Sequence, residues 1–154
     1  MSICTVVDMR LQLALNVRDL DEGIDFYSKM FGTAPAKLKP GYANFEVANP
    51  PLKLVLFENP QAEESDFQHL NHLGVETETS GEVVDAETRL SESGLETTGV
   101  DDTVCCYAEK TETWVDSPEG ARWEWYVKNG DADQLQNVVI SAGSSGDVGN
   151  VCCG

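Results

Sequence analysis

The chain repeats one succession of predicted elements, a strand, a helix and then a run of strands, and this repeat restricts its fold more than any other feature. The first copy occupies about residues 10–59 and the second about residues 69–129, so each unit has roughly 55 residues. One such unit cannot bury its own sheet. We therefore expect a single α+β domain in which two βαβββ modules, related by a pseudo-twofold axis, share one cavity.

Each module opens with a strand and an amphipathic helix. Residues 11–17 alternate as a strand, Asp19 or Asp21 can cap the helix that follows, and Gly32 ends it; in the second module Ser80 and Glu82 begin a helix that Gly94 closes. The residues expected on the buried helix faces are Ile24, Tyr27, Met30 and Phe31 in the first copy and Val83, Val84, Ala86 and Leu90 in the second.

The remaining segments are strands, turns and a tail. Residues 41–47 and 53–58 are expected to pair as a hairpin, and the last strand of the second module runs over 122–127. Residues 130–154 are rich in Gly and Ser, which predicts a flexible tail with a short ordered piece at 138–140.

Composition excludes several classes of function. The chain has 154 residues, enough for one domain, and 27 acidic against 10 basic residues give it a formal charge of -17. Such a surface repels phosphate backbones and anionic lipid, so we expect neither nucleic-acid nor membrane binding. No signal-peptide core or membrane-spanning run is present, which predicts a cytoplasmic protein.

The five cysteines are odd in number and include two adjacent pairs. They are Cys4, Cys105, Cys106, Cys152 and Cys153. This spacing is not a disulfide framework, so in a reducing compartment they should be thiols available to soft metals or metalloids. Cys105 and Cys106 could instead be small buried core residues. Cys152 and Cys153 could act as accessory thiols, but on a tail they could equally be dispensable.

Overlaying the two modules brings polar residues into register. Gln12 falls on His72, and Glu124, between two tryptophans of the last strand, falls on Leu54. One amide, one imidazole and one carboxylate with open coordination positions resemble a facial triad for ferrous iron. Each residue also has an ordinary explanation, since buried glutamine, histidine and glutamate commonly satisfy backbone or side-chain partners.

The chain from Leu11 to about Asn129 resembles the vicinal oxygen chelate superfamily, and within it the cadmium-inducible and carbon-arsenic lyase branch. The segments that carry this resemblance are residues 11–17, 26–32, 39–45, 50–56, 70–75 and 105–108. The resemblance implies cleavage of the carbon–arsenic bond of trivalent organoarsenicals such as methylarsenite, with iron(II) and dioxygen. It further implies that Gln12, His72 and Glu124 hold the iron and that Cys105 and Cys106 hold arsenic. No role is assigned to Lys110.

Both thiols can reach one arsenic atom only if the backbone leaves strand geometry, since neighbouring strand residues point to opposite faces. We therefore expect an irregular or mobile loop around residues 101–110. The alternatives are a thiol-based cadmium or arsenite binding protein without turnover, and an isomerase or thiol transferase of the same fold, against which the apolar fourth position counts. The preferred organic substituent and the oligomeric state, including a homodimer, stay open.

Overall fold

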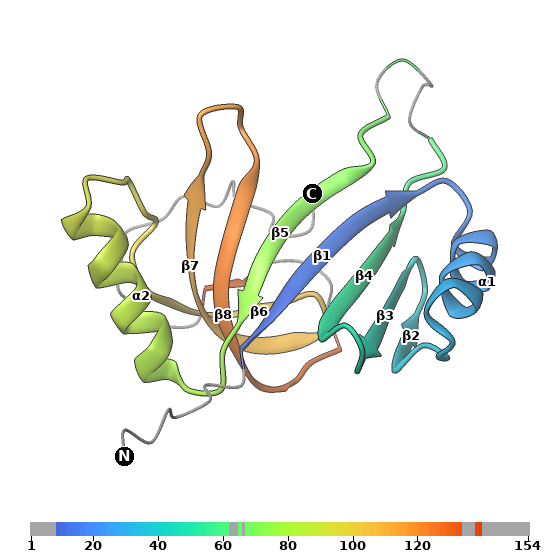
Figure 1. The fold of residues 1–154 in the computed structure, drawn as a ribbon, viewed down its shortest axis with the longest axis horizontal. Coiled ribbons are helices and arrows are strands. Elements are labelled where there is room, and N and C mark those ends of the chain that lie inside the picture. Colours follow the sequence, from blue (N-terminus) through green and yellow to red (C-terminus); the bar gives the residue numbers. More distant parts are fainter. Residues whose placement is uncertain (1–8, 62–64, 66, 134–137, 140–154) are drawn as a thin grey trace.

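The computed structural model describes residues 9–61, 65, 67–133 and 138–139, and it is built on one sheet whose strand order is β2-β3-β4-β1-β5-β8-β7-β6-β9 (Figure 1). The first module contains β1 (Arg10–Val17), α1 (Leu20–Phe31), β2 (Lys37–Lys39), β3 (Tyr42–Val47) and β4 (Leu52–Glu58). The second contains β5 (Leu70–Glu76), α2 (Ser80–Glu92), β6 (Asp101–Cys105), β7 (Ala108–Asp116) and β8 (Arg122–Asp131), and the short strand β9 (Val138–Val139) follows.

The strand pairings confirm the two-module architecture. β1 pairs in parallel with β4, and β5 pairs in parallel with β8, so the two modules have the same internal topology. Antiparallel pairing of β1 with β5 joins the modules edge to edge, where Gln12 lies opposite Gly74 and Ala14 opposite His72. The strands of the two modules therefore form halves of one continuous sheet, and its inner face carries residues from both copies.

Helix α1 begins and ends where the sequence predicts. The Asp19 side chain accepts a hydrogen bond from the Glu22 N–H, and Gly32 closes the helix in the left-handed conformation with φ 65°. The helix packs on β3 and β4 over a cluster that includes Leu54, with Ile24, Tyr27 and Phe31 partly buried against it. Met30 is 62% exposed, so its predicted inward position was wrong, because Ile24, Tyr27 and Phe31 already fill the face toward the sheet.

Helix α2 repeats this arrangement in the second module. It begins at Ser80 as predicted, and Thr79 is its N-cap and accepts from the Glu82 N–H. Val83, Ala86 and Leu90 are buried as predicted, but Val84 is 46% exposed, since it lies to one side of the stripe that faces β7 and β8.

The segment predicted as an irregular loop is a hairpin. β6 and β7 pair from Asp101 opposite Glu112 to Cys105 opposite Ala108, so only Cys106 and Tyr107 form the turn. Both turn residues have positive φ, 52° and 60°, as in the two-residue turns that match the twist of a β-hairpin. The prediction of a loop over 101–110 was therefore wrong, although the backbone does leave strand geometry at Cys106.

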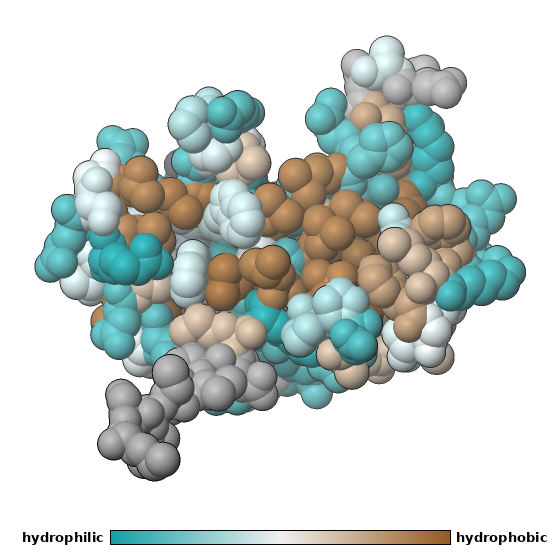
Figure 2. Space-filling view, viewed as in Figure 1, coloured by the Kyte–Doolittle hydropathy of each residue, from teal (hydrophilic) through white to brown (hydrophobic). Residues whose placement is uncertain are grey.

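The outer face of the sheet carries apolar surface. Figure 2 shows apolar side chains gathered between the two helices, over the central strands. Leu11 of β1 is 56% exposed and Leu70 of β5 is 38% exposed. In the part of the chain that the structure describes, no helix is both long and apolar enough to cross a bilayer. Cys4, Cys152, Cys153 and most of the predicted tail lie outside the described residues.

Candidate metal and thiol site

Gln12, His72 and Glu124 come from three neighbouring strands and meet on the inner face of the sheet. The Nε2 atom of His72 lies 3.2 Å from the Gln12 amide nitrogen and 3.4 Å from Glu124 Oε2. All three side chains are buried, with Glu124 fully so. The structure thus brings together the three residues that the overlay of the modules selected.

Strand register explains why they meet. Gly74 of β5 pairs with Gln12 of β1 on one side and with Glu124 of β8 on the other, so Gln12, Gly74 and Glu124 form one row across the sheet. His72 lies two residues before Gly74 on the same strand, where it pairs with Ala14. A Cβ atom at position 74 would lie 3.1 Å from the Glu124 carbonyl oxygen and 3.3 Å from Gln12 Oε1. Gly74 therefore leaves the space that the Gln12 side chain occupies.

The site contains buried polar atoms without protein partners. Gln12 Oε1 and Glu124 Oε2 have no hydrogen-bond partner in the structure, although both are shielded from solvent. Unsatisfied buried acceptors are costly, and here two of them lie around a histidine nitrogen. A divalent cation that accepts nitrogen and oxygen donors would satisfy all three groups, so the donor set fits the metal that the resemblance implies. Within the described residues, no cluster of three His, Cys, Asp or Glu side chains could hold a metal, so this candidate depends on Gln12.

Asn71 fixes the orientation of the His72 ring. His72 Nδ1 lies 2.8 Å from Asn71 Oδ1, and the Asn71 amide nitrogen donates in turn to Asn16 Oδ1 at 3.0 Å. Because the Asn71 nitrogen is committed to Asn16, its oxygen must accept, and Nδ1 of His72 must carry the hydrogen. Nε2 is then the ring nitrogen that faces Gln12 and Glu124, on the side where a metal would bind.

Lys110 balances the charge of Glu124. Its ammonium lies 2.8 Å from Glu124 Oε1, and both side chains are buried. Burial opposes ionisation of Glu124, but Lys110 and then His72 outweigh it and hold the pKa of this carboxyl below its usual range. Burial likewise opposes the charge of Lys110, yet Glu124 and Glu112 keep its pKa above the ordinary value.

Glu112 is a second buried carboxyl beside Glu124. Burial, and then the negative charge of Glu124, raise the pKa of Glu112 to about 8. Its Oε2 atom has no hydrogen-bond partner. Because this pKa lies above neutrality, the Glu112 carboxyl is protonated at neutral pH.

Val55 occupies the position in the first module that Glu124 occupies in the second, and we call it the fourth corner of the site. The predicted overlay had placed Leu54 there. Leu13 pairs with Leu54, whereas its counterpart Leu73 pairs with Trp123, so the residue that matches Glu124 is Val55. Leu54 points to the other face and packs under α1. The overlay from the sequence alone was displaced by one residue, and this reverses the face in a strand.

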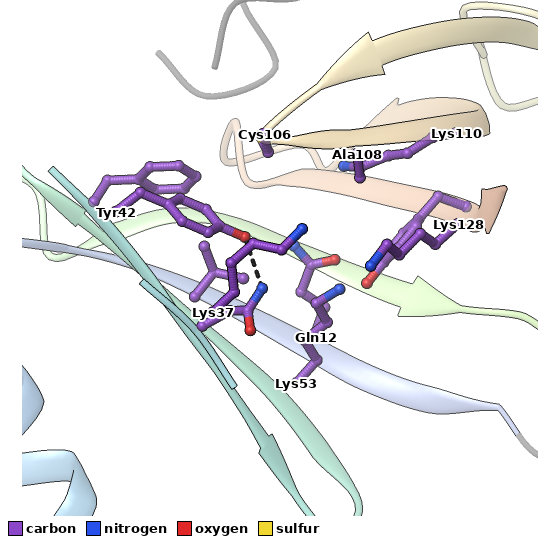
Figure 3. A pocket seen from close by; sticks show the side chains of 12 residues that line it. Gln12, Lys37, Tyr42, Lys53, Cys106, Ala108, Lys110 and Lys128 are labelled. Atoms are coloured by element: carbon purple, nitrogen blue, oxygen red, sulfur yellow. Dashed lines mark hydrogen bonds between the residues drawn. The ribbon is translucent and has the colours of Figure 1, made fainter. Parts of the chain in front are cut away.

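A cavity adjoins these ligands and ends at the thiol turn (Figure 3). Its free space is about 10 Å³, room for roughly one water molecule. Gln12, Lys110, Val55 and Cys106 are among its lining residues. The sulfur atoms of Cys105 and Cys106 lie 3.1 Å apart, and both cysteines pack in one buried cluster with Val55, Tyr42 and Trp114. Cys106 of the thiol pair and Gln12 of the candidate metal ligands therefore border the same cavity.

Several residues of the site were not identified from the sequence. Asn71, Lys37, Lys53 and Glu112 received no role, and Lys110 was left unassigned. Lys110 and Glu112 could have been found from alternation, because they share the inward face of β7 with Trp114, which packs edge-on against His72 at 5.2 Å. Trp123 and Trp125 flank Glu124 on the opposite face, and Arg89 of α2 lies 5.5 Å from the Trp125 ring.

Comparison with known families agrees with this topology. Residues 10–125 match the family model of the Glyoxalase/Bleomycin resistance protein/Dioxygenase superfamily. The chain belongs to this superfamily. A trivalent organoarsenical cleaving enzyme of Thermomonospora curvata is 53% identical over 152 residues, covering 94% of this chain and 99% of that protein. The cadmium-induced protein CadI of Mycobacterium tuberculosis is 46% identical over 144 residues, covering 94% and 92%.

Solved structures of the superfamily share the fold at low sequence identity. The Mn(II)-bound glyoxalase of Novosphingobium aromaticivorans is 14% identical with a TM-score of 0.58, and the match covers 84% of this chain and 42% of that one. The predicted superfamily, its branch and the α+β fold are confirmed by these matches.

Proposed function

We propose that this protein cleaves the carbon–arsenic bond of trivalent organoarsenicals such as methylarsenite, with iron(II) and dioxygen. One observation carries the proposal: Cys106, whose sulfur lies 3.1 Å from that of Cys105, lines the same cavity as Gln12, and Gln12 contacts the buried His72. The similarity to proteins named trivalent organoarsenical cleaving enzymes supports it.

The thiols suit capture of the substrate. Trivalent arsenic prefers sulfur ligands, so two thiols replace its two hydroxyl groups and release two water molecules. Adjacent strand residues would point apart, but the turn places both sulfur atoms on one side, 3.1 Å from each other. Cys105 and Cys106 would thus hold arsenic while its organic group points into the cavity.

Gln12, His72 and Glu124 would hold the metal. Iron(II) bound there would supply a redox-active Lewis acid for the reaction with dioxygen. Asn71 orients His72, Lys110 keeps Glu124 ionised, and the apolar Val55 leaves the fourth corner without a protein ligand. Burial of the whole set excludes water from the reacting groups, and the thiols position the substrate beside them.

The decisive experiment measures arsenite release from methylarsenite by iron-loaded protein in air. Anaerobic and metal-free samples should release none, and Cys105→Ser or Cys106→Ser should abolish turnover while iron binding is retained. The double variant Cys152→Ser/Cys153→Ser is the matched control, since it removes the other vicinal pair. Activity in both Cys105→Ser and Cys106→Ser would refute the thiol-anchor role.

The same assay separates the alternative function. A cadmium or arsenite binding protein would retain the metalloid without consuming dioxygen. Arsenical binding without release of arsenite in air would therefore favour that alternative.

A further inference from the structure

The thiol turn is held against the first module by a lysine that lies far from it in sequence. Lys37 of β2 donates to the Tyr107 carbonyl oxygen at 3.0 Å and forms an ion pair with Asp131 at 2.8 Å. We propose that Lys37 is the positioning residue of the vicinal thiols, fixing the end of the β6–β7 hairpin, which carries Cys105 and Cys106, at the cavity.

The geometry of the turn shows what this contact holds in place. Tyr107 is the second turn residue, and its carbonyl also accepts from the Ala132 N–H at 3.0 Å. Its ring packs against Tyr42 of the first module, with 5.1 Å between ring centres. Lys37 and Cys106 both line the cavity (Figure 3), so the contact closes the boundary between the modules.

Asp131 holds Lys37 in position. Its carboxylate also accepts from Lys128 at 2.7 Å, and the side chain of Lys37 is only 20% exposed. The ammonium thus lies between a carboxylate and a carbonyl oxygen, and such charge-assisted hydrogen bonds are stronger than neutral ones. Because a lysine ammonium has three donors, it can serve both acceptors together.

In this arrangement the thiols are closed to solvent. Cys105 is 0% exposed and Cys106 is 7% exposed, so a reagent reaches them only when the turn moves away from the first module. Lys37 therefore sets the balance between a closed turn, with the sulfur atoms beside the metal ligands, and an open turn that admits a ligand. Its importance for turnover rests on the proposed function, but its effect on thiol access does not.

The test is the rate of alkylation of each cysteine by iodoacetamide, followed by peptide mass spectrometry on the full-length, metal-free protein. Lys37→Met should raise the rates at Cys105 and Cys106 about tenfold, equivalent to ~1.4 kcal/mol of lost closure. Loss of a nearby cation would by itself lower the thiolate fraction and slow alkylation, so a faster rate reports access.

Two controls complete the design. Lys29→Met removes the same charge from an exposed ion pair on α1 and should leave both rates unchanged. Asp131→Asn keeps the Lys37–Tyr107 hydrogen bond but weakens its anchor, and should raise the rates about threefold. If Lys37→Met does not fold, the test uses Asp131→Asn, because the Asp131 side chain is exposed.

Rates within twofold of the native protein in the folded Lys37→Met variant, or in Asp131→Asn if that variant alone folds, would overturn the proposal. Failure of the native protein to release arsenite would refute the proposed function and leave the alkylation result intact.

Discussion

Gly74→Ala tests directly whether the packing around Gln12 builds the site. The added Cβ would stand 3.1 Å from the Glu124 carbonyl oxygen, 3.3 Å from Gln12 Cβ and 3.3 Å from Gln12 Oε1. The Glu124 carbonyl oxygen and Gln12 Cβ belong to the strands paired on either side of β5, so they cannot move independently of the sheet. The Gln12 amide is therefore the group that must shift.

The cost follows from the size of the overlap. Relief of contacts a few tenths of an ångström too short in a packed interior costs about 1–3 kcal/mol. For a domain of this size each kcal/mol lowers Tm by about 2–4 °C, so we expect a decrease of roughly 2–12 °C. Displacement of the Gln12 oxygen should also weaken metal binding by about tenfold, a loss of the kind seen when the support of a ligand is removed.

The measurements are thermal unfolding and cobalt(II) affinity, determined by competition with a chelator while the absorption spectrum reports the ligands. Gly23→Ala is the matched control, because its Cβ would meet Val17 at 3.2 Å and Leu56 at 3.4 Å, only side-chain atoms, at a helical position where Ala is favoured. It should leave metal affinity unchanged. An unchanged Tm and an unchanged cobalt affinity in Gly74→Ala would refute the assigned role of this row.

Two further predictions concern the groups around the ligands. Asn71→Leu removes the acceptor that orients His72, and the affinity for cobalt(II) should fall about 10–100-fold by the same competition assay, with Asn71→Asp retaining most of it; equal affinities would contradict the orienting role. The pKa of Glu112 rises from 4.5 to about 8 on folding, so between these pH values the folded metal-free protein keeps a proton that the unfolded chain loses. The free energy of unfolding, relative to that of Glu112→Gln, should therefore be greatest below about pH 4.5 and decline as the pH rises to about 8. The total decline should be at most about 5 kcal/mol. Urea unfolding at about pH 5 and pH 8 measures this, and a difference independent of pH would refute the buried, protonated carboxyl.

Local patterns in the sequence were sufficient for the architecture and for the three candidate ligands. Alternation in β1, β5 and β8 places Gln12, His72 and Glu124 on one face, and the capping residues Asp19 and Gly32 define α1. These features depend on neighbours within a few residues, which is why a repeat can be aligned without knowledge of the sheet.

Long-range register was not accessible in the same way. The displacement from Val55 to Leu54 arose because the closing strands were aligned by their ends, whereas their true alignment is set by pairing with β1 and β5. Lys37 lies 70 residues from the carbonyl it bonds, and no local pattern reports such a contact. An irregular or mobile loop was predicted around residues 101–110, and the tight turn at Cys106 was missed because positive φ is uncommon for residues other than glycine.

The corrected position of Val55 explains how a symmetric fold produces an asymmetric site. The pseudo-twofold axis exchanges Gln12 with His72 and would exchange Glu124 with Val55, and the structure places these residues in two adjacent rows across the central strands. A polar residue at position 55 would complete four protein ligands and crowd the centre. Val55 instead packs in the buried cluster that contains Cys105 and Cys106, so the position without a metal ligand lies on the side of the thiols. The open side of the site and the thiol pair are thus products of the same departure from symmetry.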